Sequence, residues 1–330
     1  MNVFRGIKPL ILCTLLSVSA SATTLAGSFA FVTNQNSSDV SVLDLDQRVE
    51  IRRIPVPGKP AGIVVAPSLS AFYTVSPDSK TVRKFDLATC QLITEAQLDG
   101  GPTGIALDPK SGQVFVSDWY NARIFVLNAD DLSLSRNLQT GSAPAGLVVD
   151  PDGHWLASAD RDANQVSLFD LKDLTLIQRI NVGVRPFGIA VDPSGRIHAA
   201  NVGSNSVSII TPKTASVIAT VPVGERPYGI GFADGKAFTT DQYADTISVF
   251  RLTDFELETT IDVGEYPEGI SSADDGKLIV STNWFSNTVS LIDPVKVEVI
   301  GEIETGDGPR AFGRFILETP PGERPCSKTE

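Results

Sequence analysis

Short apolar runs alternate with polar turn residues along most of the chain, and the same arrangement recurs at a nearly constant spacing. In the clearest copy the apolar runs lie at residues 187–192, 197–201, 207–210 and 217–223. They are rich in Val, Ile, Phe and Thr and are separated by Gly, Pro, Asn and Ser, which is typical of short β-strands joined by tight turns. Each copy therefore predicts four antiparallel strands, named A to D here in chain order.

A proline at the start of strand A marks every copy of this unit. The seven prolines are Pro60, Pro102, Pro144, Pro186, Pro227, Pro267 and Pro309. Their numbers differ by 42, 42, 42, 41, 40 and 42. A period in this range with four strands per unit is typical of the blades of a β-propeller.

The two ends of the array are incomplete in complementary ways. Residues 28–56 carry strands B, C and D without strand A, whereas the last copy carries strand A, Phe312 to Leu317, and then stops. An open sheet edge exposes unpaired backbone groups, and a closed ring removes that edge. We therefore predict an all-β fold: one seven-bladed β-propeller domain of four-stranded antiparallel blades over residues 23–330, with a tail at 318–330. Its last blade combines the N-terminal strands with the C-terminal strand.

Two residues after the proline, six of the copies carry a glycine, as in Pro186-Phe187-Gly188. The first strand of every blade lies nearest the propeller axis, where a side chain would crowd its neighbours. The seventh copy has Ala311 instead, which is still small. These small residues support the assignment of strand A to the inner edge of each blade.

The first 22 residues have the features of a secretory signal peptide. A short basic region precedes an apolar run at 10–18 that is too short to span a bilayer, and Ala20-Ser21-Ala22 resembles a cleavage site. The alternative is a lipoprotein signal ending at Cys13, but Leu12 is large where such signals need a small residue. We expect a periplasmic or secreted protein with no membrane span after cleavage.

Two cysteines remain after signal cleavage, Cys90 and Cys326. Cys90 lies at a C–D turn of the first complete blade, and Cys326 follows the strand that closes the ring. The nine residues from Glu318 to Cys326 can reach about 30 Å, enough to join these neighbouring blades. An even pair in an oxidising compartment predicts a Cys90–Cys326 disulfide, with two free thiols as the alternative.

Several strand B ends carry a recognisable motif, as in Phe31-Val32-Thr33-Asn34, Phe115-Val116-Ser117-Asp118 and Phe238-Thr239-Thr240-Asp241. Together with the Asn-x-Val-Ser segments and the Val-Gly-x-x-Pro-x-Gly loops, they resemble the YVTN-repeat (YncE-like) β-propeller family over nearly all of the mature chain. Phe stands here where the motif has Tyr. The resemblance implies a secreted, periplasmic or surface protein with one of varied roles, and it supplies no catalytic residues.

An Asn or Asp ends strand B in six copies. The six residues are Asn34, Asp118, Asp160, Asn201, Asp241 and Asn283. They resemble a ring of metal ligands, but a residue present in nearly every blade favours a structural role, here side-chain oxygens that cap the B–C turn. We predict no metal at this ring.

The sequence predicts no catalytic residue and no cofactor. His154 lies in an A–B turn, and His198 takes the place of an apolar core residue, which disfavours a histidine-based triad, haem or metal site. The repeats are close to equal in length, so no insertion covers a catalytic site as a lid. The formal net charge of −12, or −12 − 2 = −14 without the signal, argues against general nucleic-acid binding but leaves a local basic patch open.

The repeat is broken on the face that carries the D–A and B–C loops. The candidate ligand-binding residues there are Trp119, Arg161, Arg185, Phe187, Arg226, Tyr228, Tyr243, Glu268 and Trp284. Tyr266 and Phe285 stand in the same loops. Aromatic rings and arginines together suit a partly flat, anionic ligand. The alternative is that the rings pack between blades and the arginines pair with neighbouring carboxylates.

We therefore predict a monomeric binding or scaffolding protein that recognises a small molecule, peptide or protein partner at this rim. The fourth to sixth Pro-x-Gly copies are the expected sector. The alternative is a metal-dependent lactonase- or lyase-like propeller enzyme, because six-bladed hydrolases have similar Pro-x-Gly-Ile-Ala strands. Seven copies of the repeat count against that alternative.

Overall fold

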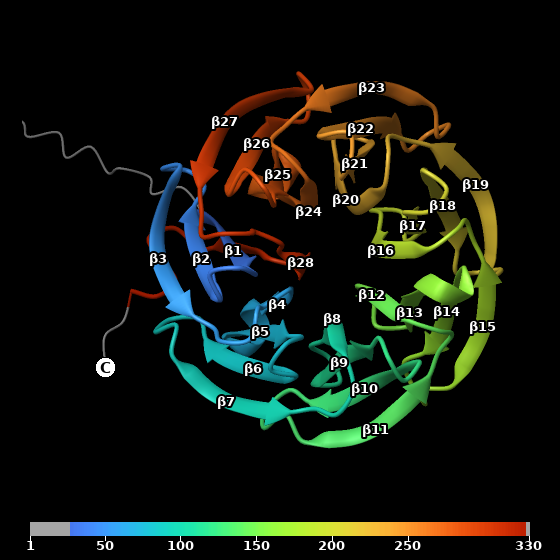
Figure 1. The fold of residues 1–330 in the computed structure, drawn as a ribbon, viewed down its shortest axis with the longest axis horizontal. Coiled ribbons are helices and arrows are strands. Elements are labelled where there is room, and N and C mark those ends of the chain that lie inside the picture. The colour runs from blue at the N-terminus through green and yellow to red at the C-terminus, as the bar shows by residue number, and fades with distance from the viewer. Residues whose placement is uncertain (1–26, 328–330) are drawn as a thin grey trace, which may run out of the picture.

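The computed structural model describes residues 27–327 and shows seven sheets in a ring around a central axis (Figure 1). In each sheet strand A is innermost and strand D lies at the circumference. The predicted seven-bladed propeller is confirmed. The predicted signal peptide lies outside the described residues. Within residues 27–327, no helix has the length and apolar composition that a membrane crossing needs.

The six blades that begin with a Pro-x-Gly copy follow one another along the chain. The first three are β4 (Gly62–Ala66), β5 (Ala71–Ser76), β6 (Thr81–Asp86), β7 (Leu92–Gln97); β8 (Pro102–Asp108), β9 (Gln113–Asp118), β10 (Arg123–Asn128), β11 (Leu134–Gln139); and β12 (Pro144–Val149), β13 (Trp155–Asp160), β14 (Gln165–Asp170), β15 (Leu176–Asn181). The next three are β16 (Pro186–Val191), β17 (Ile197–Asn201), β18 (Ser206–Thr211), β19 (Ser216–Pro222); β20 (Pro227–Ala233), β21 (Lys236–Asp241), β22 (Thr246–Arg251), β23 (Leu257–Asp262); and β24 (Pro267–Ala273), β25 (Leu278–Asn283), β26 (Thr288–Asp293), β27 (Glu298–Glu304). Short 3₁₀ turns are η1 (Pro67–Leu69), η2 (Arg161–Ala163) and η3 (Asp274–Gly276).

The closing blade is built from both ends of the chain, as predicted. Its strands are β1 (Gly27–Asn34), β2 (Asp39–Asp44), β3 (Val49–Pro55) and the C-terminal β29 (Ile316–Thr319). Strand β29 pairs antiparallel with β1, where Ala30 lies opposite Ile316. The ring is thus closed by hydrogen bonds between strands almost 290 residues apart, since Ala30 and Ile316 are separated by 316 − 30 = 286 positions.

The C-terminal segment is not one continuous strand. Its first part, β28 (Phe312–Arg314), pairs in parallel with β4 of the first blade. Gly313 makes this close pairing possible: its φ is 133°, and a Cβ there would collide with the carbonyl oxygen of Ile63. The segment therefore contacts two blades and reaches toward the centre of the ring (Figure 1).

The apolar core lies between neighbouring blades. For example, Val82 of β6 and Phe125 of β10 belong to one buried cluster that joins the first and second blades. The outer strands bury far less: in β11 only Leu138 is buried. Face-to-face packing of blades explains why the inner three strands of each repeat are the more apolar ones.

The repeated glycines mark close contacts between inner strands, as predicted. A Cβ on Gly146 would lie 2.6 Å from the carbonyl oxygen of Phe187, and one on Gly188 would collide with that of Tyr228. The crowding partner is thus the backbone of the next Pro-x-Gly copy, and a larger residue would push adjacent blades apart.

A disulfide joins Cys90 and Cys326, whose Cα atoms are 4.9 Å apart. The Cys326 amide also donates to the carbonyl oxygen of Leu87, at 3.0 Å. The chain after β29 is therefore fixed to the C–D turn of the first blade, as the sequence predicts. The bond closes a sequence separation of 236 residues.

Candidate functional site

The Asn and Asp side chains at the ends of strand B are fully buried and bonded within the protein. Asn201 donates to the hydroxyls of Ser206 and Ser208 on strand C, at 3.1 and 3.0 Å. A Cβ on Gly183 would lie 2.6 Å from Asn201, so the D–A loop packs directly on this side chain. These Asn and Asp side chains therefore have a structural role. The sequence predicts that they cap the B–C turn, but they bond mainly to strand C and the D–A loop, because this loop covers the ends of the strands.

The acidic members of this ring differ in their pKa. Burial alone would raise the pKa of Asp118, but the Gly101 amide and Arg123, which bonds at 2.7 Å, hold it below its ordinary value. Burial raises the pKa of Asp241 to about 6, since its side-chain partners, Thr246 and Ser248, are uncharged hydroxyls. Whether a cation lies within hydrogen-bond distance of the carboxylate thus decides whether its pKa is lowered or raised.

Three aromatic rings close the axis at the face of the D–A and B–C loops. Phe187 lies 4.4 Å from Tyr228 and 5.0 Å from Phe312, measured between ring centroids. All three are buried in one cluster with Ala145. We call Phe187, Tyr228 and Phe312 the aromatic plug. Two of the predicted ligand residues thus lie beneath the surface, in contact with each other.

A buried polar network supports the plug. Arg310 lies 2.8 Å from the Glu268 carboxylate and donates to the Tyr228 hydroxyl at 2.5 Å. Gln242 donates to the other Glu268 oxygen at 2.8 Å. Glu268 is 2% exposed, and burial raises its pKa despite the opposing effect of Arg310. The predicted ligand residue Glu268 is therefore bonded inside the protein.

The three predicted arginines are placed differently. Arg161 bonds Asp162 at 2.6 Å and covers Trp119, with 5.3 Å between guanidinium carbon and ring centroid. Arg226 stacks on Tyr243 at 3.9 Å. Within residues 27–327, Arg185 and Arg226 make no ion pair with a carboxylate, and Arg185 is exposed. Carboxylate pairing thus accounts for Arg161 but not for the other two.

The two unpaired arginines occupy equivalent loop tips. Both have left-handed backbones, with φ of 55° at Arg185 and 56° at Arg226. Their amides donate to Asn164 and Asn205 of the preceding B–C loops, at 2.8 and 3.1 Å. These bonds hold the D–A tips in one orientation, so the guanidinium groups start from fixed positions on the rim.

Beside Arg226, neighbouring rings form a continuous ridge. Tyr243 lies 5.3 Å from Tyr266, which lies 5.0 Å from Phe285, and Trp284 packs edge-on against Phe285 at 4.6 Å. We call Tyr243, Tyr266, Trp284 and Phe285 the aromatic ridge. Tyr243 is 46% exposed and Phe285 57%. The structure thus brings Tyr243 and Trp284 together with two loop aromatics that stand outside the predicted ligand set.

A hollow of about 240 Å³ lies along the ridge. Its lining residues are Gln242, Tyr243, Asp245, Glu265, Tyr266 and Phe285. Gln242 connects the hollow to the buried Glu268 network. The repeat pattern does not single out Asp245 and Glu265 as site residues, because acidic residues are common in the exposed loops of this chain.

The histidines lie away from this face. His198 is fully buried and lies 2.9 Å from the Asp192 carboxylate, and burial lowers its pKa. His154 is in the turn between β12 and β13. One ring nitrogen of His154 and one carboxylate oxygen each from Asp150 and Asp152 lie within 4.8 Å of one another there. The hydrogen bond between His154 Nδ1 and Asp150, at 2.8 Å, explains this arrangement as part of the turn.

Comparisons with known proteins agree with the fold. A family profile described as NHL repeat matches residues 100–127, which span β8 to β10 of the second blade. A search of curated proteins found no significant match. The short profile match and the closed ring place the chain among seven-bladed β-propellers built from repeats.

Solved structures of the same architecture cover most of the chain. A functionally unknown protein from Desulfotomaculum acetoxidans DSM 771 has a TM-score of 0.74 and 15% identity, covering 89% of this chain and 99% of that one. Kuenenia stuttgartiensis hydrazine synthase has a TM-score of 0.72 and 19% identity, and the match covers 80% of this chain and 91% of that one. A streptogramin B lyase has a TM-score of 0.66 and 20% identity, and the match covers 77% of this chain and 89% of that one. At these identities the likeness concerns the fold alone.

Proposed function

We propose that this chain is an exported, YVTN-like binding propeller that recognises a ligand or partner on its D–A/B–C loop face. The observation that carries the proposal is the exposed aromatic ridge beside the unpaired Arg226. A disulfide fits a periplasmic or secreted location, because such bonds persist in oxidising compartments.

The ridge has the physical properties of a recognition surface. Exposed aromatic groups that gather in one place mark binding sites more often than scattered ones do. The rings contact one another, so binding restricts few additional rotamers. The guanidinium carbon of Arg226 lies over the Tyr243 ring, 3.9 Å from its centroid, which extends the aromatic surface with a positive charge.

The rim also restricts the chemistry of the ligand. Arg185 and Arg226 suit a carboxylate or phosphate, as arginine pairs with these groups through two hydrogen bonds. Asp245 and Glu265 line the adjacent hollow and repel a second negative charge. We infer a ligand with a flat body over the ridge and negative charge confined to its arginine-facing end.

Binding is favoured over catalysis because the most perturbed acidic groups are not at the hollow. Glu268, Asp241 and Asp160 have raised pKa values, but each is buried and bonded internally. A general acid or base needs contact with the substrate. Tyr266 of the ridge lines the hollow, and burial raises its pKa to about 12, which keeps the phenol neutral and makes it a poor general base at neutral pH.

A thermal-shift screen of periplasmic metabolites and cell-wall fragments identifies the ligand, and variants then test the site. We expect Tyr243→Ala and Arg226→Met each to weaken binding of a hit by about tenfold or more, with little change in melting temperature. Tyr120→Ala is the matched control, because Tyr120 is 76% exposed on another blade. Unchanged affinity in both ridge variants, or equal loss in the control, would refute the placement.

A further inference from the structure

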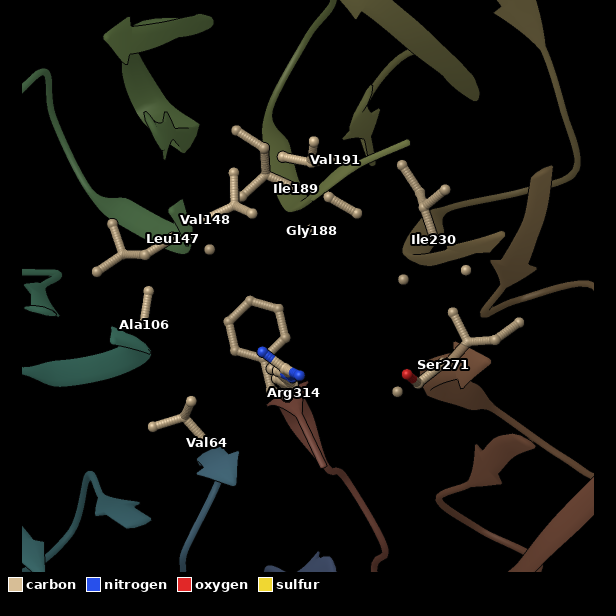
Figure 2. A pocket seen from close by; sticks show the side chains of 18 of the residues that line it. Val64, Ala106, Leu147, Val148, Gly188, Ile189, Val191, Ile230, Ser271 and Arg314 are labelled. Atoms are coloured by element: carbon tan, nitrogen blue, oxygen red, sulfur yellow. The ribbon is translucent and has the colours of Figure 1, made fainter. Parts of the chain in front are cut away.

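The opposite end of the axis holds a separate cavity of about 350 Å³. Figure 2 shows its wall, to which strand A of the first six blades contributes apolar side chains such as Val64, Leu147, Ile189 and Ile230. Phe312 of the aromatic plug also lines it. The cavity is therefore a blind funnel, open toward the A–B turns, with a size typical of small-ligand sites.

One charged side chain lies in this funnel. Arg314 is at the centre of the ring of lining residues in Figure 2 and, among residues 27–327, is the only ionisable one that lines the cavity. It is exposed, and within residues 27–327 it has neither an ion pair nor a side-chain hydrogen bond. The funnel thus presents five guanidinium donors next to apolar walls.

Arg314 lies where the last copy has two more residues than the others between its proline and the paired part of strand A. Leu107, five positions after its proline, pairs with Val114, whereas Ala30, which takes the place of Val114 in the closing blade, pairs with Ile316, seven positions after Pro309. The parallel pairing of β28 with β4, which Gly313 permits, brings this copy to the axis. The two extra positions let Arg314 lie at the axis instead of in the sheet of the closing blade, so it is a feature of the funnel rather than of the blade.

The acidic residues at this end do not neutralise Arg314. Asp192 accepts hydrogen bonds from Arg196 at 2.6 Å and lies 2.9 Å from His198. Asp108 accepts from two amides of its own turn, those of Lys110 and Ser111. The carboxylates at the A–B turns therefore serve their turns, and Arg314 supplies the charge inside the funnel.

We propose that the funnel binds an amphipathic monoanion, a carboxylate on an unbranched hydrocarbon chain. Its head pairs with Arg314, and its chain lies against Val148, Ile189 and Ile230 toward the Phe312 floor. The ion pair forms on an exposed guanidinium, so its desolvation is partial, while the hydrocarbon chain moves from water onto the apolar wall. This site is on the other face from the aromatic ridge and is independent of the function proposed for it.

Calorimetry of the mature protein with decanoate tests the proposal directly. We expect Arg314→Met to weaken decanoate binding by about tenfold or more, Arg314→Lys to weaken it less, and both to leave decanol binding unchanged. Arg52→Met is the matched control, because Arg52 is an exposed arginine on β3. Arg226→Met reports the other face and is expected to leave decanoate binding unchanged.

Two further measurements examine the apolar wall. From hexanoate to octanoate to decanoate, affinity is expected to rise several-fold at each step, since each methylene leaves water. Val148→Phe fills part of the funnel and is expected to weaken decanoate and decanol alike. Equal affinity of the wild type and Arg314→Met for decanoate would overturn the proposal. So would absence of decanoate binding to the wild type, or tighter binding of decylamine than of decanoate.

Discussion

At one end of the propeller axis, Phe187, Tyr228 and Phe312 meet in a closed plug. At the other end, the inner strands leave an apolar funnel around Arg314. Both ends depend on the same short C-terminal segment, which places Phe312 and Arg314 two residues apart. The comparison shows that a ring of similar blades acquires two unlike faces through the one copy that departs from the repeat.

Buried carboxylates fall into two types according to their partners, and Asp118 at the plugged end belongs to the second type, whose pKa is lowered. At the plugged end, burial raises the pKa of Glu268 and brings that of Asp241 to about 6. At the funnel end, burial opposes ionisation of Asp192, but hydrogen bonds from His198, Ser194 and Arg196 hold its pKa well below the ordinary range. A carboxylate whose pKa is raised stabilises the fold at low pH, and one whose pKa is lowered stabilises it at higher pH.

The largest expected effect comes from removing the segment that both ends share. A chain that stops before Pro309 lacks β28, β29, the Phe312 ring and Arg314, and it leaves β1 as an open edge. We expect aggregation or loss of cooperative unfolding, measured by circular dichroism on heating and by size-exclusion chromatography.

A shorter truncation is the control for this prediction. Stopping after Pro325 removes Cys326 and its disulfide but keeps both C-terminal strands. This protein is expected to unfold cooperatively with a stability lower by about 2–4 kcal/mol. A chain ending before Pro309 that melts like the full protein would contradict closure by the C-terminal strands.

The next effect separates the plug from the ridge on the same face. Phe312→Ala removes a buried ring that contacts Phe187 and Tyr228, and we expect a loss of about 3–5 kcal/mol in the free energy of unfolding. Phe285→Ala removes an exposed ring of the ridge and is expected to cost less than about 1 kcal/mol. Urea unfolding measures both, and similar losses would show that plug and ridge are not distinct.

The smallest effect concerns the pH response of the plugged end. Because the pKa of Asp241 is raised to about 6 in the folded protein, its contribution is fully present below the unfolded pKa and is lost as pH rises through about 6. Other blades already have an asparagine at this position, namely Asn201 and Asn283. We therefore expect Asp241→Asn to raise the free energy of unfolding by about 1–3 kcal/mol at neutral pH and to change it little at about pH 4.

Asp118→Asn is the opposite case in an equivalent position. The pKa of Asp118 is lowered, so its contribution is present above the unfolded pKa and is lost as pH falls through the folded value. This variant is expected to lose stability at neutral pH, where the Arg123 pair is broken. If both variants shift stability in the same direction at neutral pH, the partner chemistry assigned to the two carboxylates is wrong.

Much of the architecture follows from local sequence signals. The spacing of Pro60 to Pro309 predicts the blades, because each blade is one period of strands and tight turns. The complementary ends at residues 28–56 and 312–317 predict the closure, and the positions of Cys90 and Cys326 predict the disulfide. These features depend on backbone periodicity and on counting, which the sequence contains in full.

The direction of side chains relative to the axis was decided by the tertiary structure. Phe187 and Tyr228 stand at the loop end of strand A by sequence, yet the converging inner strands turn their rings inward to form the plug. Counting from Pro309 places Arg314 in line with strand A, but its place in the funnel requires the parallel pairing that Gly313 permits. Local periodicity sets where strands begin and end, whereas contacts between residues hundreds of positions apart set which side chains meet at the axis.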